Sequence, residues 1–275
     1  GKVNKDQAFL NWITDNSVEN VVLDIPLSKP LCSSCDLDCP GEERCHRTEV
    51  VNVREKLQLF IDKDFQESTK SPKNYERKRE EQKSYDHNRN VLSEENDSLP
   101  LSKSFKRKLK KGYTPYWNRP IDFYIWKKYY DQLLRLFNYS YDSYGQISLV
   151  MNEKFAYFQK HFPRQLELWE SNVQVCLIEL LKAKIVSEKN ISGLRFVDEQ
   201  SIDLRRNIVT ELEQNLNIFI YQHDLELLIN EPKALNAFIL AIAGQSRLLN
   251  RNVKIPEWCL SEKESFIVPE AFLEE

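Results

Sequence analysis

The chain has 275 residues, of which 41% are hydrophobic and 29% are charged, and its formal net charge is −3. This length allows one large or two small domains with a buried core. The small net charge excludes a general attraction to nucleic acid or membranes, so such binding would need a local patch. No apolar run approaches the roughly 18 residues of a membrane span, and no signal peptide opens the chain. We therefore expect a cytoplasmic protein without membrane contact.

A short helix and a strand are the first predicted elements. Apolar residues recur at helical spacing over residues 5–14, and a polar break follows. Residues 21–23 form a short aliphatic run that ends before Pro26, which is typical of a buried strand. Asp24 directly follows this run, and open α/β sheets bind ligands at the carboxyl ends of their strands. Asp24 is therefore the first candidate catalytic residue.

Four cysteines follow this strand in a segment that we call the cysteine loop (residues 32–45). Two, three and five residues separate Cys32, Cys35, Cys39 and Cys45. Inside a cell, clustered thiols favour a metal site over disulfides. Zinc prefers four such ligands in a tetrahedron, so we expect a structural zinc site, in which His46 could replace Cys45. An iron–sulfur cluster and metal-free thiols, reduced or oxidised, are the alternatives. Cys176 and Cys259 lie in apolar surroundings and are expected in the core.

Residues 62–112 form a highly charged segment with few large apolar side chains, after a helix predicted over residues 48–61. Because this composition disfavours a packed core, we expect a flexible insertion. Cations near its end could follow a phosphate backbone, or could simply be solvated. The candidate nucleic-acid-binding residues of this segment are Lys106, Arg107, Lys108, Lys110 and Lys111.

Ordered structure is predicted to return at residue 113. Two prolines flank a restricted loop that contains Arg119, which could brace the loop or bind phosphate. Asp122 could cap a helix that runs to about residue 139. Residues 165–170 alternate like a strand. Further helices are predicted over residues 147–161, 173–184, 199–216 (with Arg205 and Arg206 exposed) and 232–250.

Several segments resemble a family of predicted RNase H-like nucleases with a domain of unknown function. The stretch from Asp24 to Cys35, with the Cys39-Pro-Gly run after it, is similar to the family's acid-Ala-Pro-Leu, proline-cysteine and Cys-Pro-Gly segments. Weaker similarities follow in the family's order. They are Pro115-Tyr-Trp-Asn-Arg119 to a Pro-Tyr-Thr-x-Arg segment, Glu167-Leu-Trp to a strand motif, and Leu235-Asn-Ala-Phe to a closing Asp-Ala motif.

The resemblance implies an α/β fold with a partial RNase H-like core, in which helices cover a mainly parallel sheet. In that fold, acids hold two divalent ions, Mg²⁺ or Mn²⁺, about 4 Å apart. Asp24 would take the fourth-strand role, with Glu167 or Glu170 on the neighbouring strand. We expect the fold's first three strands and first catalytic acid to be absent from this sequence. Asn236 stands where the family has an acid, and Glu231 lies nearby.

These observations divide the chain into three parts. Residues 1–61 begin the core and include the cysteine loop, residues 62–112 are the insertion, and residues 113–275 are the helix-rich remainder. The first expected function is a metal-dependent nuclease or phosphoester hydrolase, intact or degenerate. The alternative is a non-catalytic, zinc-containing module that binds nucleic acid or protein, and a small-molecule enzyme is the third. Three or more acids near Asp24 would favour catalysis, whereas one or two would favour binding.

Overall fold

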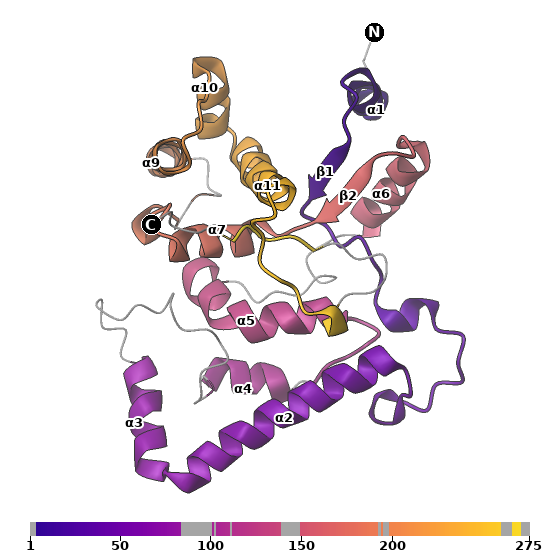
Figure 1. The fold of residues 1–275 in the computed structure, drawn as a ribbon, viewed down its shortest axis with the longest axis vertical. Helices are drawn as coiled ribbons and strands as arrows, with labels where there is room; N and C mark the ends of the chain where they lie inside the picture. Colours follow the sequence, from indigo (N-terminus) through magenta and orange to yellow (C-terminus); the bar gives the residue numbers. More distant parts are fainter. Residues whose placement is uncertain are drawn as a thin grey trace.

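The computed structural model describes residues 4–83, 101, 103–110, 112–138, 149–191, 194, 198–259 and 266–270. Within these ranges the chain is mainly helical, with one small sheet beside the helices (Figure 1). The helices are α1 (Lys5–Asp15), α2 (Thr48–Lys70), α3 (Pro72–Lys83), α4 (Lys103–Lys110), α5 (Pro120–Phe137), α6 (Leu149–His161), α7 (Val173–Lys182), α8 (Glu188–Ile191), α9 (Glu199–Leu216), α10 (Gln222–Asn230) and α11 (Pro232–Leu248). The strands are β1 (Asn20–Leu23) and β2 (Glu167–Glu170), and short 3-10 helices cover Leu31–Ser34, Glu42–Arg44 and Glu257–Cys259.

The two strands pair in parallel, as the sequence predicted for the strand before Asp24 and the strand of Glu167. Asn20 lies opposite Glu167, and Leu23 lies opposite Glu170. On the far side of β2, the amide of Ile267 donates to the carbonyl of Glu170 at 2.8 Å, so a C-terminal segment lies along the end of that strand. The predicted α/β class is thus confirmed, with a small parallel sheet in a mainly helical chain.

Helix α11 packs directly against the sheet. A Cβ atom at Gly244 would lie only 2.9 Å from Cγ2 of Val22, so glycine permits a close approach of helix and strand. Trp169 of β2 lies near the same position. Buried residues of β2, α7, α9, α10 and α11 complete this apolar cluster and include Trp169, Val173, Leu177, Val209, Leu228, Leu235, Ile239 and Ala243.

A second apolar cluster surrounds α5, which lies between α7 and α2 in Figure 1. Its members from α2, α5 and the C-terminal segment include Val53, Phe60, Ile125, Tyr129, Leu133 and Val268. Pro120 occupies the first turn of α5, where its missing N–H has no helical partner to lose. Asp122 was predicted to cap this helix, but it lies inside the first turn and accepts a hydrogen bond from the amide of Arg119 at 2.7 Å.

The charged segment contains more packed structure than its composition indicated. Helix α2 continues to Lys70 rather than ending at residue 61, and α3 and α4 follow. The Asp64 carboxylate accepts hydrogen bonds from the Tyr75 hydroxyl at 2.8 Å and from the Leu101 amide at 2.9 Å. Lys106 Nζ lies 2.6 Å from the same carboxylate and also donates to the Tyr75 hydroxyl. The predicted flexible insertion also includes residues 84–100, which lie outside the described residues.

Arg205 corrects a further expectation, because we predicted it to be exposed and it is fully buried. Its Nε donates to the carbonyl of Ile229 at 2.5 Å, and its Nη1 donates to that of Leu194 at 3.0 Å. Arg206 is exposed as predicted, and Cys176 and Cys259 are buried as predicted.

No single helix in the described ranges is both long and apolar enough to cross a membrane. Helices α10 and α11 meet that criterion only when taken together, and they are bent by 114° where they join.

Candidate functional site

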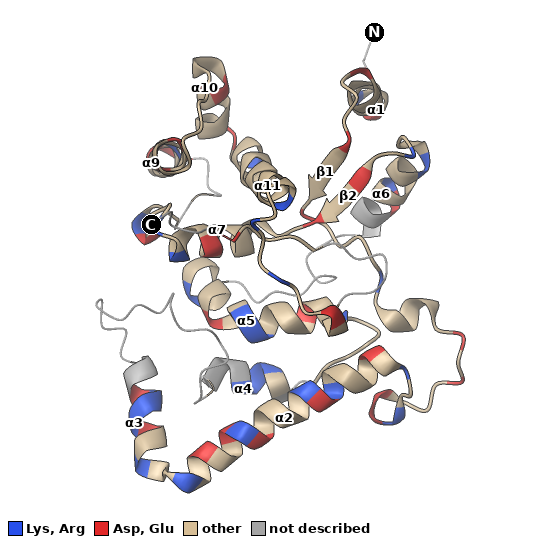
Figure 2. Cartoon of the chain, in the orientation of Figure 1, with Lys and Arg blue, Asp and Glu red and all other residues tan. Residues whose placement is uncertain are grey.

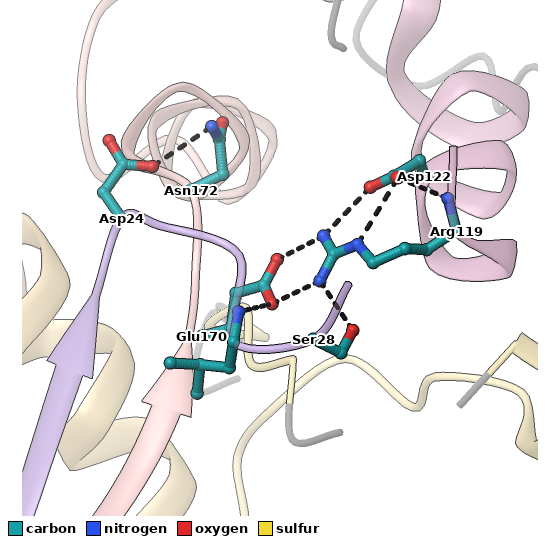
Figure 3. A network of polar contacts seen from close by, with 7 residues as sticks. Asp24, Ser28, Arg119, Asp122, Glu170 and Asn172 are labelled. Carbon is teal, nitrogen blue, oxygen red and sulfur yellow. Dashed lines mark hydrogen bonds and ion pairs between the residues drawn. The ribbon is translucent and has the colours of Figure 1, made fainter. Parts of the chain in front are cut away.

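The parallel register brings two acids to the same end of the sheet. Leu23 lies opposite Glu170, so Asp24, the next residue, extends just beyond the paired strands. Figure 3 shows both carboxylates at this end, with Asn172 beside Asp24 and Arg119 beside Glu170. The carboxyl end of parallel strands is where open α/β sheets bind ligands, and this is the place that the sequence indicated for Asp24.

Glu170 is held by a two-pronged ion pair with Arg119. Nη1 of Arg119 lies 2.7 Å from Oε2 of Glu170, and Nη2 lies 2.6 Å from Oε1. The amide of Leu27 also donates to Oε2 at 2.9 Å. The side chains of Arg119 and Glu170 are only 1% and 4% exposed. Both oxygens of this carboxylate therefore have charged donors inside the protein, which is the strongest form of protein hydrogen bond.

Arg119 also binds a second acid at the start of α5. Its Nη2 lies 3.0 Å from Oδ1 of Asp122, and its amide donates to Oδ2 at 2.7 Å. Nη1 donates to the Ser28 hydroxyl at 3.1 Å (Figure 3). One guanidinium thus joins the end of β2, the loop after β1 and the first turn of α5. We call Glu170, Arg119, Asp122 and Ser28 the strand-end network.

The strand-end network contains two carboxylates, those of Glu170 and Asp122, and one guanidinium, that of Arg119. Burial raises the pKa of Glu170, and the adjacent Arg119 opposes this rise. The charge of Glu170 also acts on the next acid, because it adds to the effect of burial in raising the pKa of Asp24. The sequence could not show this arrangement, since Arg119 and Glu170 are 51 residues apart.

Asp24 lies in a different environment from Glu170. Its Oδ1 accepts a hydrogen bond from Nδ2 of Asn172 at 3.3 Å, and the carboxylate also accepts one from the amide of Val173. Burial of part of the group and the charge of Glu170 together raise its pKa from 3.8 to about 6. The residue nevertheless remains exposed. Asp24 is therefore an accessible acid that can exchange a proton near neutral pH.

Sequence reasoning missed the polar residues that follow β2. Asn172 caps α7, because its side chain accepts from the amide of Val175 at 3.0 Å, and it also binds Asp24. Ser171 donates to the carbonyl of Ile267 at 2.7 Å and lies 3.2 Å from Sγ of Cys176. Burial raises the pKa of Cys176 to about 12, which leaves a thiol rather than a nucleophilic thiolate. An asparagine directly before a helical pattern was the available signal for the cap.

The remaining predicted site residues come from the other end of β2 and from the beginning of α11. Glu167 is exposed at the opposite end of β2, where it pairs with Asn20. Asn236 and Glu231 belong to the beginning of α11, whereas this helix contacts Val22 through Gly244. At 1.5 Å per residue, Asn236 and Glu231 are about 12 and 20 Å along the helix from that contact. The structure therefore places Asp24 and Glu170 at one end of the sheet and Glu167 at the other, with Glu231 and Asn236 at the beginning of α11.

Two metal sites were expected, one at the strand ends and one in the cysteine loop. In the ranges that the structure describes, no three His, Cys, Asp or Glu side chains are placed to hold a metal ion. At the strand ends, Glu170 is committed to Arg119, so Asp24 stands as the accessible carboxylate. In the cysteine loop, the donor set suits zinc, but the sulfurs would have to move together to form a tetrahedron.

The cysteine loop is fixed to the rest of the chain at two places. The Cys32 amide donates to the carbonyl of Pro115 at 3.2 Å, next to the Arg119 loop. Nη1 of Arg54 in α2 donates to the carbonyls of Glu42 and Glu43 at 3.2 and 2.6 Å. All four thiols are free, and partial burial together with the charges of the other three raises the pKa of Cys32. The cysteines therefore lie within electrostatic range of one another.

The predicted basic residues are partly used inside the protein. Lys106 pairs with Asp64, and Nζ of Lys108 lies 3.9 Å from the ring centre of Trp126. Arg107 is exposed. Lys111 and the side chain of Lys110 lie outside the described residues. Figure 2 shows that Lys and Arg alternate with Asp and Glu along α2 and α3, so these helices do not present a surface of one charge.

Comparison of the chain with protein-family models, with curated proteins and with solved structures gives no match.

Proposed function

We propose that this chain is a non-catalytic binding module, built on an RNase H-like strand pair and carrying a structural zinc in its cysteine loop. The observation that supports this function best is the pairing of both Glu170 oxygens with Arg119. This pairing leaves one accessible carboxylate, Asp24, where metal-dependent hydrolysis would need several. By the criterion of clustered acids, one or two acids near Asp24 favour binding over catalysis, and Glu170 is the acid whose charge acts on the pKa of Asp24.

The energetics of the strand-end network support the same proposal. Two-metal hydrolysis requires carboxylates that bridge two cations about 4 Å apart. For Glu170 to serve as such a ligand, it would have to leave Arg119. Separation of a buried ion pair leaves an uncompensated charge and costs about 3–5 kcal/mol. The geometry therefore favours a structural role for Glu170, and Asp24 alone is a poor anchor for a pair of cations.

Hydrolysis assays test the non-catalytic part of the proposal. Purified chain is incubated with single- and double-stranded DNA, RNA, an RNA–DNA hybrid and bis-p-nitrophenyl phosphate, in Mg²⁺ or Mn²⁺. We expect equal, background rates for the parent, for Asp24→Asn and for the control Asp203→Asn, an exposed acid on α9. Metal-dependent cleavage that Asp24→Asn abolishes and Asp203→Asn retains would overturn the proposal.

Zinc would join two parts of the chain that the cysteine loop already contacts. The loop is hydrogen-bonded to Pro115 and to Arg54, so closure on a metal would connect the Arg119 loop to α2. Such a site gathers deprotonated thiolates, which the unfolded chain does not hold together, and so it would stabilise the fold. With four protein ligands, the metal would have no open position for water.

Metal analysis tests this zinc site. We expect about one zinc per chain by mass spectrometry, loss of zinc in Cys35→Ser, and retention in the control Cys259→Ala, which removes a buried thiol outside the loop. Iron with visible absorption would identify an iron–sulfur cluster instead. Protein free of both metals after purification without chelators would refute the metal site.

A protein partner fits the described surface better than nucleic acid. Lys106 and Lys108, two of the cations expected to contact phosphates, are turned to Asp64 and Trp126. The overall charge of −3 adds no attraction to a polyanion. Tight DNA or RNA binding with a steep salt dependence, lost in Arg107→Gln, would contradict this preference.

A metal-dependent phosphoester hydrolase is the second candidate function. One observation favours it, which is the raised pKa of Asp24, about 6, at the carboxyl end of a parallel strand pair. Perturbed carboxylates at such positions are frequent in active sites. The hydrolysis assays above decide between the two candidates.

A further inference from the structure

We propose that the outer edge of β1 binds an extended, lysine- or arginine-bearing segment of a partner protein, which adds a strand to the sheet. This inference rests on the proposed binding function and names the partner's chemistry. Strand addition uses main-chain hydrogen bonds for affinity and alternate side chains for specificity.

The hydrogen bonds between the strands show which groups face outward. The amide of Glu167 donates to the carbonyl of Glu19 at 2.8 Å, and the amide of Ser171 donates to that of Leu23 at 2.9 Å. In a parallel pair, alternate residues of a strand bond to the same neighbour. Since Glu19 and Leu23 face β2, the main-chain groups of Asn20 and Val22 point to the opposite side.

The two edges of this sheet differ. On the outer side of β2, the Glu170 carbonyl is paired with the amide of Ile267. Among the residues that the structure describes, β1 pairs with β2 alone, and no isolated bridge involves it. Asn20 and Val22 are each half-buried rather than fully buried. An unpaired edge of this kind is a ready template for another strand.

The charge around this edge selects the partner. From residue 6 to residue 28 the chain contains Asp6, Asp15, Glu19 and Asp24 but no Lys or Arg. Asp6 is paired with Lys154 at 2.7 Å. Glu19 is exposed and lies just before β1, at the beginning of the edge, whereas the Asp24 carboxylate just after β1 accepts hydrogen bonds from Asn172 and from the amide of Val173. A strand with cationic side chains would meet a complementary potential there, whereas an acidic strand would be repelled.

A single proline can block this edge without breaking the sheet. The amide of Asn20 points away from β2, so Asn20→Pro removes an outward donor and keeps the bonds between β1 and β2. Proline is tolerated at the first residue of a strand and on strand edges. Asn20→Thr is the matched control, because it changes the same side chain and retains the amide. Urea unfolding of both variants checks that the fold is intact.

Fluorescence polarisation with short labelled peptides tests the proposal. The probe is a peptide of alternating lysine and valine. Two peptides serve for comparison: one of alternating glutamate and valine, and the lysine peptide with every second main-chain nitrogen methylated. We expect the lysine peptide to bind the parent and Asn20→Thr equally, and to bind Asn20→Pro about tenfold more weakly. Glu19→Gln should weaken binding severalfold at low salt, and hydrogen exchange at Asn20 and Val22 should slow in the complex.

Three outcomes would overturn the inference. The first is equal binding of the lysine and glutamate peptides to the parent chain. The second is equal binding of the methylated and unmethylated lysine peptides to the parent chain, a comparison that requires no variant of the protein. The third is a dimer of the free chain that Asn20→Pro abolishes, because the edge would then be occupied by a second copy. Since hydrolysis is measured separately, failure of peptide binding would leave the non-catalytic proposal standing.

Discussion

Two regions of this protein each contain a buried carboxylate that is bound by a cation and by a main-chain amide, but the two ion pairs differ in burial. At the strand ends, Glu170 is held by Arg119 and by the amide of Leu27. Among helices α2, α3 and α4, Asp64 is bound by Lys106, by the Tyr75 hydroxyl and by the amide of Leu101. Each buried acid therefore fixes the main chain of a segment distant in sequence, 143 residues away for Leu27 and 37 for Leu101.

The difference lies in the cation. Arg119 presents a rigid fork to both oxygens of Glu170, and both side chains are almost fully buried. The Lys106 side chain is 32% exposed and meets Asp64 through one flexible ammonium group. Solvent therefore weakens the second ion pair far more than the first. We infer that the strand-end network anchors the fold, whereas the Asp64 cluster docks helices that can be released at lower cost.

The largest expected effect comes from the arginine. Arg119→Met leaves Glu170 and Asp122 buried without their cation, so the free energy of unfolding should fall by about 3–5 kcal/mol. Urea unfolding followed by circular dichroism measures this change. Arg206→Met, on the exposed face of α9, is the control and should change stability by less than about 0.5 kcal/mol. A loss below about 1 kcal/mol in Arg119→Met would mean that the two regions do not differ as proposed.

A smaller effect is expected for the lysine. Lys106→Met keeps an aliphatic side chain beside Tyr75 and removes the charge near Asp64. Because the lysine is partly exposed and Tyr75 and the Leu101 amide still bind the acid, we expect a loss of about 1–2 kcal/mol. The same urea titration gives the value. A loss as large as that of Arg119→Met would contradict the comparison.

The tyrosine sharpens the comparison within the Asp64 cluster. Tyr75→Phe removes the hydroxyl that donates to Asp64 at 2.8 Å, and should reduce stability by about 1 kcal/mol. Hydrogen exchange should show faster opening of α3 and α4, with β1 and β2 unchanged. Tyr116→Phe, on an exposed loop, is the control and should alter neither measurement. Equal acceleration in β1 would indicate that the two regions open together.

The smallest effect concerns the pH dependence at the strand ends. The folded-state pKa of Asp24 is about 6, above the ordinary 3.8, so its contribution to stability is complete below about pH 4 and is lost as pH rises through 6. The full change would correspond to about 3 kcal/mol for a buried group, and exposure of Asp24 reduces it to about 1 kcal/mol. Asp24→Asn should therefore be more stable than the parent at pH 7.5, with the advantage gone at pH 4.

Asp198 provides a control of opposite sign for this measurement. It caps α9, and its hydrogen bonds to Ser201 lower its pKa. Asparagine is also a good cap, so Asp198→Asn changes mainly the charge. The stability of Asp198→Asn should fall below that of the parent as pH rises above about 4. The stability differences of Asp24→Asn and Asp198→Asn from the parent should therefore have opposite signs above that pH. Parallel profiles would show that Asp24 does not titrate as proposed.

Local patterns predicted the elements whose signals lie within a few residues. The apolar run before Asp24 and the alternation ending at Glu170 gave the two strands, and the structure confirms that they pair. Pro232 indicated the beginning of α11, which begins at this residue, whereas α5 begins at Pro120, earlier than the predicted cap at Asp122.

The features that sequence reasoning missed depend on distant partners. Asp64 is buried only because Tyr75, Leu101 and Lys106 surround it, and composition alone described these residues as part of a charged insertion. Arg205 is buried because the carbonyls of Leu194 and Ile229 accept from it. No local spacing reports such pairings, since each partner contributes either a main-chain group or an ordinary polar side chain.

The parallel register also governs how the chain can fold during its synthesis. Asn20 pairs with Glu167, which is 147 residues later. At about 5–20 residues per second, a ribosome needs roughly 7–30 s to add that length. During this interval the apolar run of β1 has been made but β2 has not, whereas α2 can already pack against α5. The contact between α2 and α5 is therefore free to form first, while β1 has no strand partner.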